Sequence, residues 1–295
     1  MKYISLLVLL STLIPLSSFG QLPTSNIWLL KLENSDGQVT IHRAVKLTDN
    51  TGYSNQPHFT EDSKILYYTQ GFDEQSSEQT DVMAYHLSKH FHTRVTESAS
   101  SQYSPTPTPS GDGFSAIHVD GNQKQWLYQY HMDGQLGDKL TNVEPIGYHV
   151  WIGRNHVLAF VLGQPHTLQK LGQDNSAELV DDNIGASLWP IPGTDMFSYT
   201  KNPSPDGQPW TLMAVNPETL ETNPMVAMPL GAYYMAWFPS GIALTGVESK
   251  ILGWDSHSPG SQWQEWLDVS AYCKGQVSRI HVDKRGSMLA FVCNS

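Results

Sequence analysis

Charged residues are scarce in this 295-residue chain, where Asp, Glu, Lys and Arg together make up 15%. Lys and Arg number 17 against 28 Asp and Glu, which gives a formal net charge of −11. Because nucleic-acid binding requires basic side chains to neutralise phosphates, this balance argues against a nucleic-acid partner. Gly, Pro, Trp and Tyr are plentiful instead, a composition that favours many short strands over helices.

Long apolar segments are absent after residue 16. The apolar run at residues 4–16 follows Lys2 and precedes small residues at Ser18 and Gly20, a layout typical of a secretory signal peptide and too short to span a bilayer. We therefore expect residues 1–20 to be a signal peptide and residues 21–295 to form one domain; a membrane anchor or a buried N-terminal strand is the alternative. No cysteine follows the run, so we expect a periplasmic or secreted protein with no lipid anchor and no stable membrane insertion.

Cysteine is nearly absent as well, with only Cys273 and Cys293 in the chain. An exported protein permits a disulfide between them. If the C-terminal hairpin turns at residues 283–286, Cys293 faces Gln276, and Cys273 is about 10 Å further along an extended strand. Disulfides tolerate Cα separations only up to about 7 Å, so the bond requires residues 272–275 to fold back. Two buried free thiols are the alternative.

Catalytic motifs are missing from the sequence. It contains no Gly-x-Ser-x-Gly elbow, no His-Glu-x-x-His zinc helix and no calcium loop. His86, His90 and His92 lie close together, but they surround an expected hairpin turn, so we expect no metal ion or other cofactor; a Zn or Cu site is the alternative. The polar interval 71–81 is expected to be a solvated insertion, with a flap over a ligand as the alternative.

A repeat is the main feature that the chain does contain. A short extended stretch, a tight turn and an alternating apolar strand recur at intervals of about 40–50 residues, the period of a propeller or solenoid. The six turns fall at Asp62, Asp112, Arg154, Thr194, Ser240 and Arg285. Two more strands are expected after such pairs, for example at residues 82–87 and 92–96. Four strands per unit is the blade of a β-propeller.

Closure of the ring follows from the two ends of the chain. The sixth unit has only two strands before the C-terminus, and two unassigned strands remain at residues 27–32 and 39–47. Placing these strands outside the C-terminal pair completes the last blade and leaves no unfinished sheet edge. We therefore predict an all-β, six-bladed β-propeller, with five or seven blades as alternatives.

Residues 57–63 and 105–113 carry a Pro-x-aromatic and Pro-Asp-type turn pattern before an apolar strand. This pattern resembles the WD-like Pro-Asp repeats of the TolB-like β-propeller family. Residues 103–168 are similar, more narrowly, to exported bacterial members of that family. The resemblance implies a periplasmic or secreted address and the binding of peptides or proteins.

The residues just before each inner strand form the candidate site, because these connections converge on the mouth of the central channel. Tyr recurs there, and its flat ring with a hydroxyl tip is favoured in recognition surfaces, although Tyr also suits the start of a strand. The predicted ligand-binding residues are Tyr53, Asn55, Tyr103, Ser104, Tyr148, His149, Ser187 and Tyr233. Four inner-strand aromatics are expected to pack between blades, with ligand contact as the alternative: Phe59, Trp151, Trp189 and Trp237.

The predicted site contains no acidic residue, which makes it poorly suited to general acid–base or metal-assisted catalysis. We therefore expect a monomeric, non-enzymatic propeller that binds a protein, a peptide or a small polar ligand at the channel mouth. The alternative is a six-bladed propeller hydrolase resembling a lactonase or a glycosidase.

Overall fold

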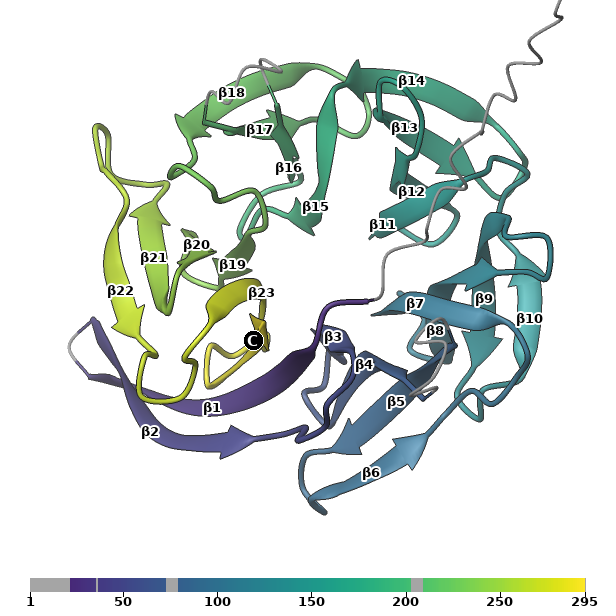
Figure 1. Ribbon diagram of the computed structural model, residues 1–295. Coiled ribbons are helices and arrows are strands. Elements are labelled where there is room, and N and C mark those ends of the chain that lie inside the picture. The colour runs from purple at the N-terminus through teal and green to yellow at the C-terminus, as the bar shows by residue number, and fades with distance from the viewer. Residues whose placement is uncertain (1–21, 36, 73–78, 203–208, 295) are drawn as a thin grey trace, which may run out of the picture.

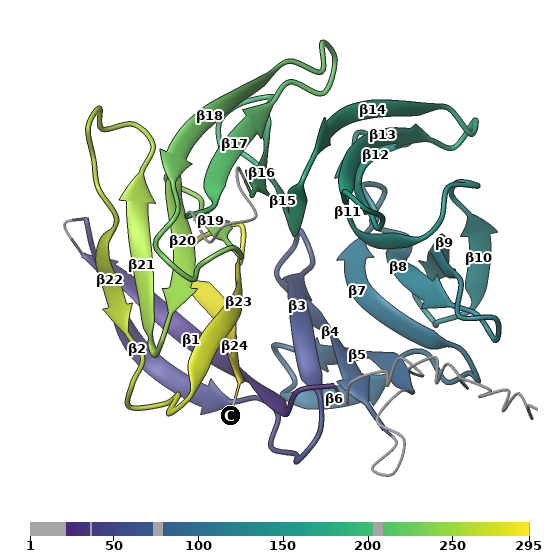
Figure 2. The same cartoon turned by 45° about the horizontal axis from the view of Figure 1, so that its top comes forward.

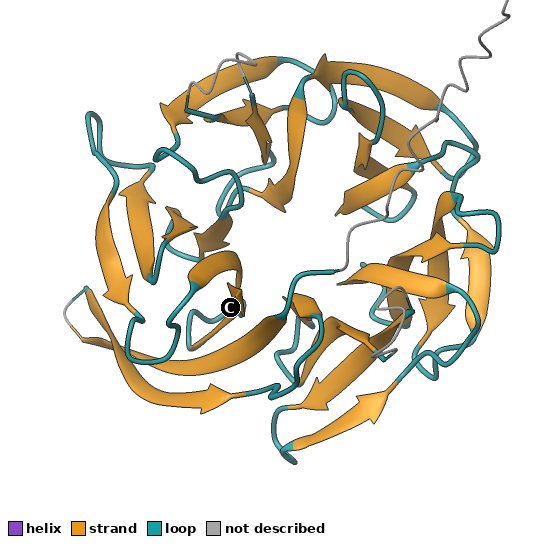
Figure 3. Ribbon diagram, in the orientation of Figure 1, coloured by secondary structure: helices purple, strands orange, loops and turns teal. Residues whose placement is uncertain are grey.

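A computed structural model describes residues 22–294, apart from residues 36, 73–78 and 203–208. The described residues form twenty-four strands in six four-stranded antiparallel sheets, and they include no helix (Figure 3). The sheets stand around a central axis as the blades of a propeller (Figure 1), which confirms the predicted fold class. Residues 1–20, the expected signal peptide, lie outside the described residues.

In blades 1 to 5 the strands follow one another outward from the axis in chain order. Blade 1 consists of β3 (Ser54–Phe59), β4 (Ile65–Gly71), β5 (Thr80–His86) and β6 (Phe91–Arg94). Blade 2 consists of β7 (Ser101–Pro107), β8 (Gly113–Val119), β9 (Gln125–His131) and β10 (Leu136–Lys139). Blade 3 consists of β11 (Ile146–Ile152), β12 (His156–Val161), β13 (Thr167–Gly172) and β14 (Ala177–Asp182).

The second half of the chain builds the remaining blades. Blade 4 consists of β15 (Ile184–Pro190), β16 (Phe197–Lys201), β17 (Thr211–Val215) and β18 (Thr222–Ala227). Blade 5 consists of β19 (Ala236–Phe238), β20 (Ile242–Val247), β21 (Lys250–Asp255) and β22 (Gln264–Asp268). Blade 6 combines β23 (Gln276–Val282) and β24 (Met288–Asn294) with β1 (Ser25–Ser35) and β2 (Gln38–Lys46).

Blade 6 closes the ring with both ends of the chain. β1 runs antiparallel to β24, from Ser25 opposite Asn294 to Lys31 opposite Met288, and β2 lies outside β1 (Figure 2). This is the predicted closure. Because β1 covers the edge of β24 that would otherwise be unpaired, the first and last strands of the described chain are held together by backbone hydrogen bonds.

Adjacent blades pack through their apolar faces. Between blades 1 and 2, the ring of Tyr67 contacts that of Phe114, with centroids 5.1 Å apart. Between blades 5 and 6 the backbones approach so closely that a Cβ at Gly246 would lie 2.3 Å from the carbonyl oxygen of Val277. Only glycine fits there, because the atom that would clash belongs to the backbone of β23 and not to a flexible side chain.

The C-terminal hairpin has a longer turn than we predicted. Val282 pairs with Leu289, whereas the expected four-residue turn would have placed it opposite Ser287. The carboxylate of Asp283 explains the difference, because its Oδ1 accepts hydrogen bonds from the backbone N–H groups of Ser287 and Met288, each at 2.7 Å. Asp283 therefore organises the wider turn.

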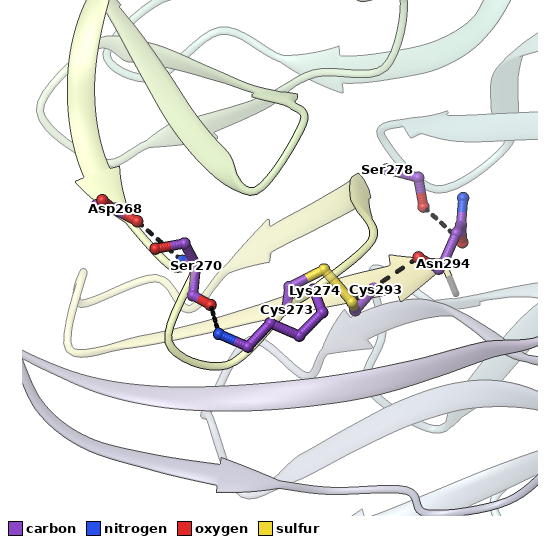
Figure 4. The surroundings of a disulfide bond; sticks show 7 residues. All are labelled: Asp268, Ser270, Cys273, Lys274, Ser278, Cys293 and Asn294. Carbon is purple, nitrogen blue, oxygen red and sulfur yellow. Dashed lines mark hydrogen bonds between the residues drawn. A yellow bond between two sulfur atoms is a disulfide. The ribbon is translucent and has the colours of Figure 1, made fainter.

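The two cysteines form a disulfide across blade 6 (Figure 4). The N–H of Cys273 donates to the carbonyl of Val269, so the chain turns back just before β23. This turn brings the Cα of Cys273 to 5.6 Å from the Cα of Cys293. The fold-back that the bond requires is therefore present, and the alternative of two free thiols is excluded in this structure.

Candidate functional site

The central channel contains a cavity of about 730 Å³ lined by residues from all six blades. At one end lie Glu61 and Lys284, whose side chains form an ion pair at 2.5 Å and are 77% and 70% exposed. At the other end lie Tyr234 and Arg279. The cavity therefore opens to solvent among the turns that follow the inner strands and extends inward to Arg279.

Six pairs of lining residues recur, two positions apart, in or directly before the inner strands. This spacing follows from the strand period, which points alternate side chains to the same side. The first positions are Gln56, Ser104, His149, Ser187, Met235 and Arg279. The second positions are His58, Thr106, Trp151, Trp189, Trp237 and His281.

Aromatic side chains from opposite blades meet in the channel. The ring centroid of Trp189 in blade 4 lies 4.8 Å from that of His281 in blade 6 and 5.4 Å from that of His58 in blade 1. Burial lowers the pKa of His58 to about 4, and burial followed by the neighbouring His58 lowers the pKa of His281 well below its usual range. These imidazoles are neutral at pH 7, so the cluster is a group of uncharged rings in mutual contact, of which Trp189 and His281 are stacked.

A buried serine behind the cavity wall fixes the ring of His149. The Oγ of Ser115 accepts from the Nε1–H of Trp151 at 2.9 Å, lies 3.2 Å from the carbonyl oxygen of Thr106 and lies 2.6 Å from the Nε2 of His149. The single hydroxyl proton satisfies all three contacts only if it goes to the carbonyl and the Nε2 of His149 carries a proton. The Nδ1 of His149 is then an acceptor.

Two polar atoms in the cavity wall have no hydrogen-bond partner in the described structure. They are the Nδ1 of His149 and the Oγ of Ser104, on side chains that are 6% and 8% exposed. Burial, followed by the nearby His58, lowers the pKa of His149 to about 3, so the ring remains a neutral acceptor. Unpaired buried polar groups are costly, which makes this pair a candidate site for a polar ligand.

Blades 4 and 5 repeat the serine arrangement without the histidine. The Oγ of Ser198 accepts from the Nε1–H of Trp237 at 2.8 Å and donates to the carbonyl oxygen of Trp189 at 3.3 Å. Met235 stands where blade 3 has His149, and its Sδ lies 3.8 Å from the same hydroxyl. Two indoles of the wall are therefore held in place by equivalent serines.

Arg279 spans the inner end of the cavity between two tyrosines. Its guanidinium carbon lies 4.6 Å from the ring centroid of Tyr148 and 3.9 Å from that of Tyr234. Its Nη2 donates to the hydroxyls of both tyrosines, at 2.8 Å for Tyr234. None of the ion pairs formed by the described residues includes Arg279.

The backbone beside Arg279 is strained. Gln56 and Ser104 have φ angles of 57° and 54°, although neither is glycine. Their contacts hold them there, because the N–H of Ser104 donates to the Oε1 of Gln56 at 2.9 Å and the Nε2 of Gln56 donates to the Oη of Tyr148 at 3.2 Å. Such strain concentrates at functional sites.

The structure divides the predicted site residues between two cavities. Ser104, Tyr148, His149 and Ser187 line the large cavity. Tyr53, Asn55 and Tyr233 line a smaller cavity of about 240 Å³. Tyr103 lies at an edge-on angle to Tyr53, with centroids 6.5 Å apart. Arg279 and Tyr234 line both cavities and so lie between the two groups.

Sequence reasoning missed Arg279, Gln56 and the histidines of the second positions. Tyr234 was missed as well, although the sequence contains a signal for it, because Trp151 and Trp237 each follow a tyrosine by three residues. Aligning the two units on tryptophan selects Tyr234, whereas we had selected its neighbour Tyr233. The four inner-strand aromatics, Phe59, Trp151, Trp189 and Trp237, all line the cavity.

In the part of the chain that the structure describes, no three His, Cys, Asp or Glu side chains converge as a metal site. The same residues include no helix long and apolar enough to cross a membrane. Within the polar interval 71–81, residues 73–78 lie outside the described residues.

Comparison with family models gives no match, and neither does comparison with curated proteins. Solved structures do match. A protein provisionally assigned as TolB in Agrobacterium tumefaciens is 13% identical over 92% of this chain and 99% of that chain, with a TM-score of 0.67. TolB of Acinetobacter baumannii is 11% identical over 92% of this chain and 64% of that chain, with a TM-score of 0.56.

Enzymes share the same architecture. A gluconolactonase from Xanthomonas campestris is 10% identical over 93% of this chain and 97% of that chain, with a TM-score of 0.59. At these identities the likeness shows the fold alone, and TolB proteins and an enzyme both adopt it. Function must therefore be argued from the residues of the channel.

Proposed function

We propose that this protein is an exported, monomeric binding propeller that receives a peptide, a protein segment or a small polar ligand in its central channel. The observation that carries the proposal is the pair of unpartnered atoms, the Oγ of Ser104 and the Nδ1 of His149, in the wall of a cavity of about 730 Å³. A ligand that hydrogen-bonds to them would remove the cost of leaving buried polar atoms unpaired.

The character of the lining supports binding over hydrolysis. Its carboxylates, Glu61 and Asp283, both lie toward the turns: Glu61 pairs with Lys284, and Asp283 binds two backbone N–H groups and the hydroxyl of Ser63. Neither is left available beside the neutral imidazoles. A general acid–base pair would need such a carboxylate within hydrogen-bond reach of the substrate.

Binding can be measured through the tryptophans that line the cavity. Fluorescence titration and calorimetry with N-acetylated tripeptides and with neutral monosaccharides should identify a class of ligand that binds. The double substitution Tyr103→Ala with Tyr148→Ala should abolish that binding while unfolding remains cooperative. Tyr128→Ala, on β9 away from the channel, is the matched control and should bind normally. Retained binding in the double variant would place the site elsewhere.

Hydrolysis is tested separately with δ-gluconolactone, by following acid release at constant pH. Release no faster than the spontaneous rate is the expected result. A rate that depends on the protein and disappears in the channel variant would replace the binding proposal by a lactonase.

Export is tested by expressing the full chain in a bacterial host and sequencing the N-terminus of the protein from the periplasmic fraction. The expected mature N-terminus is Gln21. A chain retained in the cytoplasm with residues 1–20 still attached would refute the proposed address.

A further inference from the structure

The charge of Arg279 is unbalanced inside the channel. Its two hydrogen-bond partners are the tyrosine hydroxyls of Tyr148 and Tyr234, which accept hydrogen bonds but supply no negative charge. Burial also raises the pKa of Tyr234, which keeps that hydroxyl protonated. A guanidinium is always charged in proteins, and Arg279 is half-buried, so its charge is partly removed from water without a counter-ion, which is costly.

Although Asp and Glu outnumber Lys and Arg in this chain, no carboxylate acts as counter-ion to Arg279 among the described residues. The formal net charge is −11, yet the carboxylates that line the cavity, Glu61 and Asp283, are occupied by contacts within the turns. Stacking between two tyrosine rings holds the guanidinium in place, and the strained pair Gln56 and Ser104 positions Tyr148. The guanidinium of Arg279 is therefore fixed in position, and no carboxylate among the described residues forms an ion pair with it.

The rest of the wall defines what else the ligand must carry. The Nδ1 of His149 needs a donor, and the Oγ of Ser104 can donate or accept. Around them, the faces of Trp151, Trp189 and Trp237 provide apolar area for a ring or a hydrocarbon chain. One anionic group, one N–H or O–H group and an apolar body together match this wall.

We propose that the ligand of the channel is a carboxylate, whose anionic group pairs with Arg279 while an adjacent N–H or O–H donates to the Nδ1 of His149. This inference rests on the proposed function and narrows its ligand class. The carboxyl terminus of a peptide and a free carboxylic acid share this chemistry. Since the Nη2 of Arg279 already donates to both tyrosine hydroxyls, the carboxylate would pair with the guanidinium through the Nη1 hydrogens, in a charge-assisted hydrogen bond.

The test uses two probes of nearly equal shape, N-acetyl-L-phenylalanine and N-acetyl-L-phenylalaninamide, which differ in the charge of the terminal group. Calorimetry on the intact protein should show that the acid binds at least tenfold more tightly than the amide. Arg279→Gln should weaken binding of the acid at least tenfold and leave the amide unchanged, and Arg279→Lys should fall between. Arg43→Gln, which removes an exposed cation on β2, is the matched control.

Further probes distinguish the two sources of the carboxylate. N-acetyl-Ala-Ala-Phe that binds more tightly than N-acetyl-phenylalanine indicates a peptide carboxyl terminus. Gluconate that binds more tightly than either indicates a free acid of another class. Both results support the inference if the matching amide or neutral sugar binds at least tenfold more weakly.

Failure of the inference can be told apart from failure of the proposed function. If acid and amide bind equally and the Tyr103→Ala, Tyr148→Ala variant loses both, the channel binds ligands but the carboxylate proposal is overturned. If no acid, peptide or sugar binds at millimolar concentration, both proposals fall. Should Arg279→Gln not fold, the comparison of acid and amide on the unaltered protein still decides the question.

Discussion

Replacing Ser115 with Ala tests the network that orients His149. The substitution removes one buried oxygen, which receives the Nε1–H of Trp151 and the Nε2–H of His149 and donates to the carbonyl of Thr106. Leaving a buried donor unpaired costs about 1–3 kcal/mol, so two such donors should lower the free energy of unfolding by about 3 kcal/mol. With an m-value of about 3 kcal/mol per molar urea, the unfolding midpoint should fall by about 1 M.

The equivalent serine of blade 4 supplies the control. Ser198→Ala leaves one buried indole donor, that of Trp237, and no histidine, so it should cost about half as much, near 1.5 kcal/mol. Both variants are compared by urea unfolding followed by tryptophan fluorescence. The difference in the free energy of unfolding between the two variants measures how much the hydrogen bond of His149 to Ser115 contributes to stability.

Ligand binding separates the two serines further. Without the hydroxyl of Ser115, the ring of His149 is no longer held with its Nδ1 as an acceptor, so the affinity for N-acetyl-L-phenylalanine should fall several-fold. Ser198→Ala should leave that affinity nearly unchanged. Equal destabilisation by both substitutions, together with unchanged binding in the Ser115 variant, would refute the assigned hydrogen-bond directions.

Three other outcomes are expected from the structure. Replacing Cys273 and Cys293 with Ser removes a cross-link between residues 20 apart and should cost about 3 kcal/mol by loop-closure entropy; an unfolding temperature that does not change would contradict this. Gly246→Ala should lower the free energy of unfolding by at least about 2 kcal/mol, because its Cβ would lie 2.3 Å from a backbone oxygen. If the variant unfolds at the same urea concentration as the wild type, blades 5 and 6 can move apart at no cost and the prediction is wrong. Burial holds the pKa of His58 at about 4 and that of His149 at about 3, whereas histidine in the unfolded chain titrates near 6.5. The free energy of unfolding therefore keeps its full value above pH 6.5 and falls by about 1.4 kcal/mol per histidine for each pH unit below it. His149→Asn should flatten this dependence between pH 6.5 and 4.5, and an unchanged slope would show that the ring is protonated in the folded state.

Much of the architecture could be predicted because its signals are local. Turn residues and alternating apolar strands recur with a blade-length period, and two spare strands at residues 27–32 and 39–47 matched the two missing at the C-terminus. The structure confirms six blades and this closure. The sequence does not decide between a disulfide and two free thiols, because the bond depends on a backbone turn at Cys273 that residue spacing does not specify.

The residues that line the cavity could be predicted only in part from the sequence, because side chains along the inner strands do not alternate strictly between the two faces. The pairing register shifts within β3, β7, β11, β15 and β23. In β3, β7, β11 and β23 the shift is by one residue, which moves the following side chains to the other face of the strand, so alternation in the sequence cannot tell which neighbour faces the channel. Adjacent residues can also both line the cavity, as Tyr148 and His149 do.

The sequence by itself determined the fold class and the number of blades, which follow from patterns within units of about 40–50 residues. It also determined how the ring closes, because the two spare N-terminal strands match the two missing from the C-terminal unit. Only the tertiary structure decided that Arg279 lies between Tyr148 and Tyr234, which are 131 and 45 residues away from it along the chain. In a propeller the inner strands of all blades surround one axis, so side chains that are far apart in the chain, such as those from blades 3, 5 and 6, meet only once the ring is closed. The local shifts of register then decide which of them face one another.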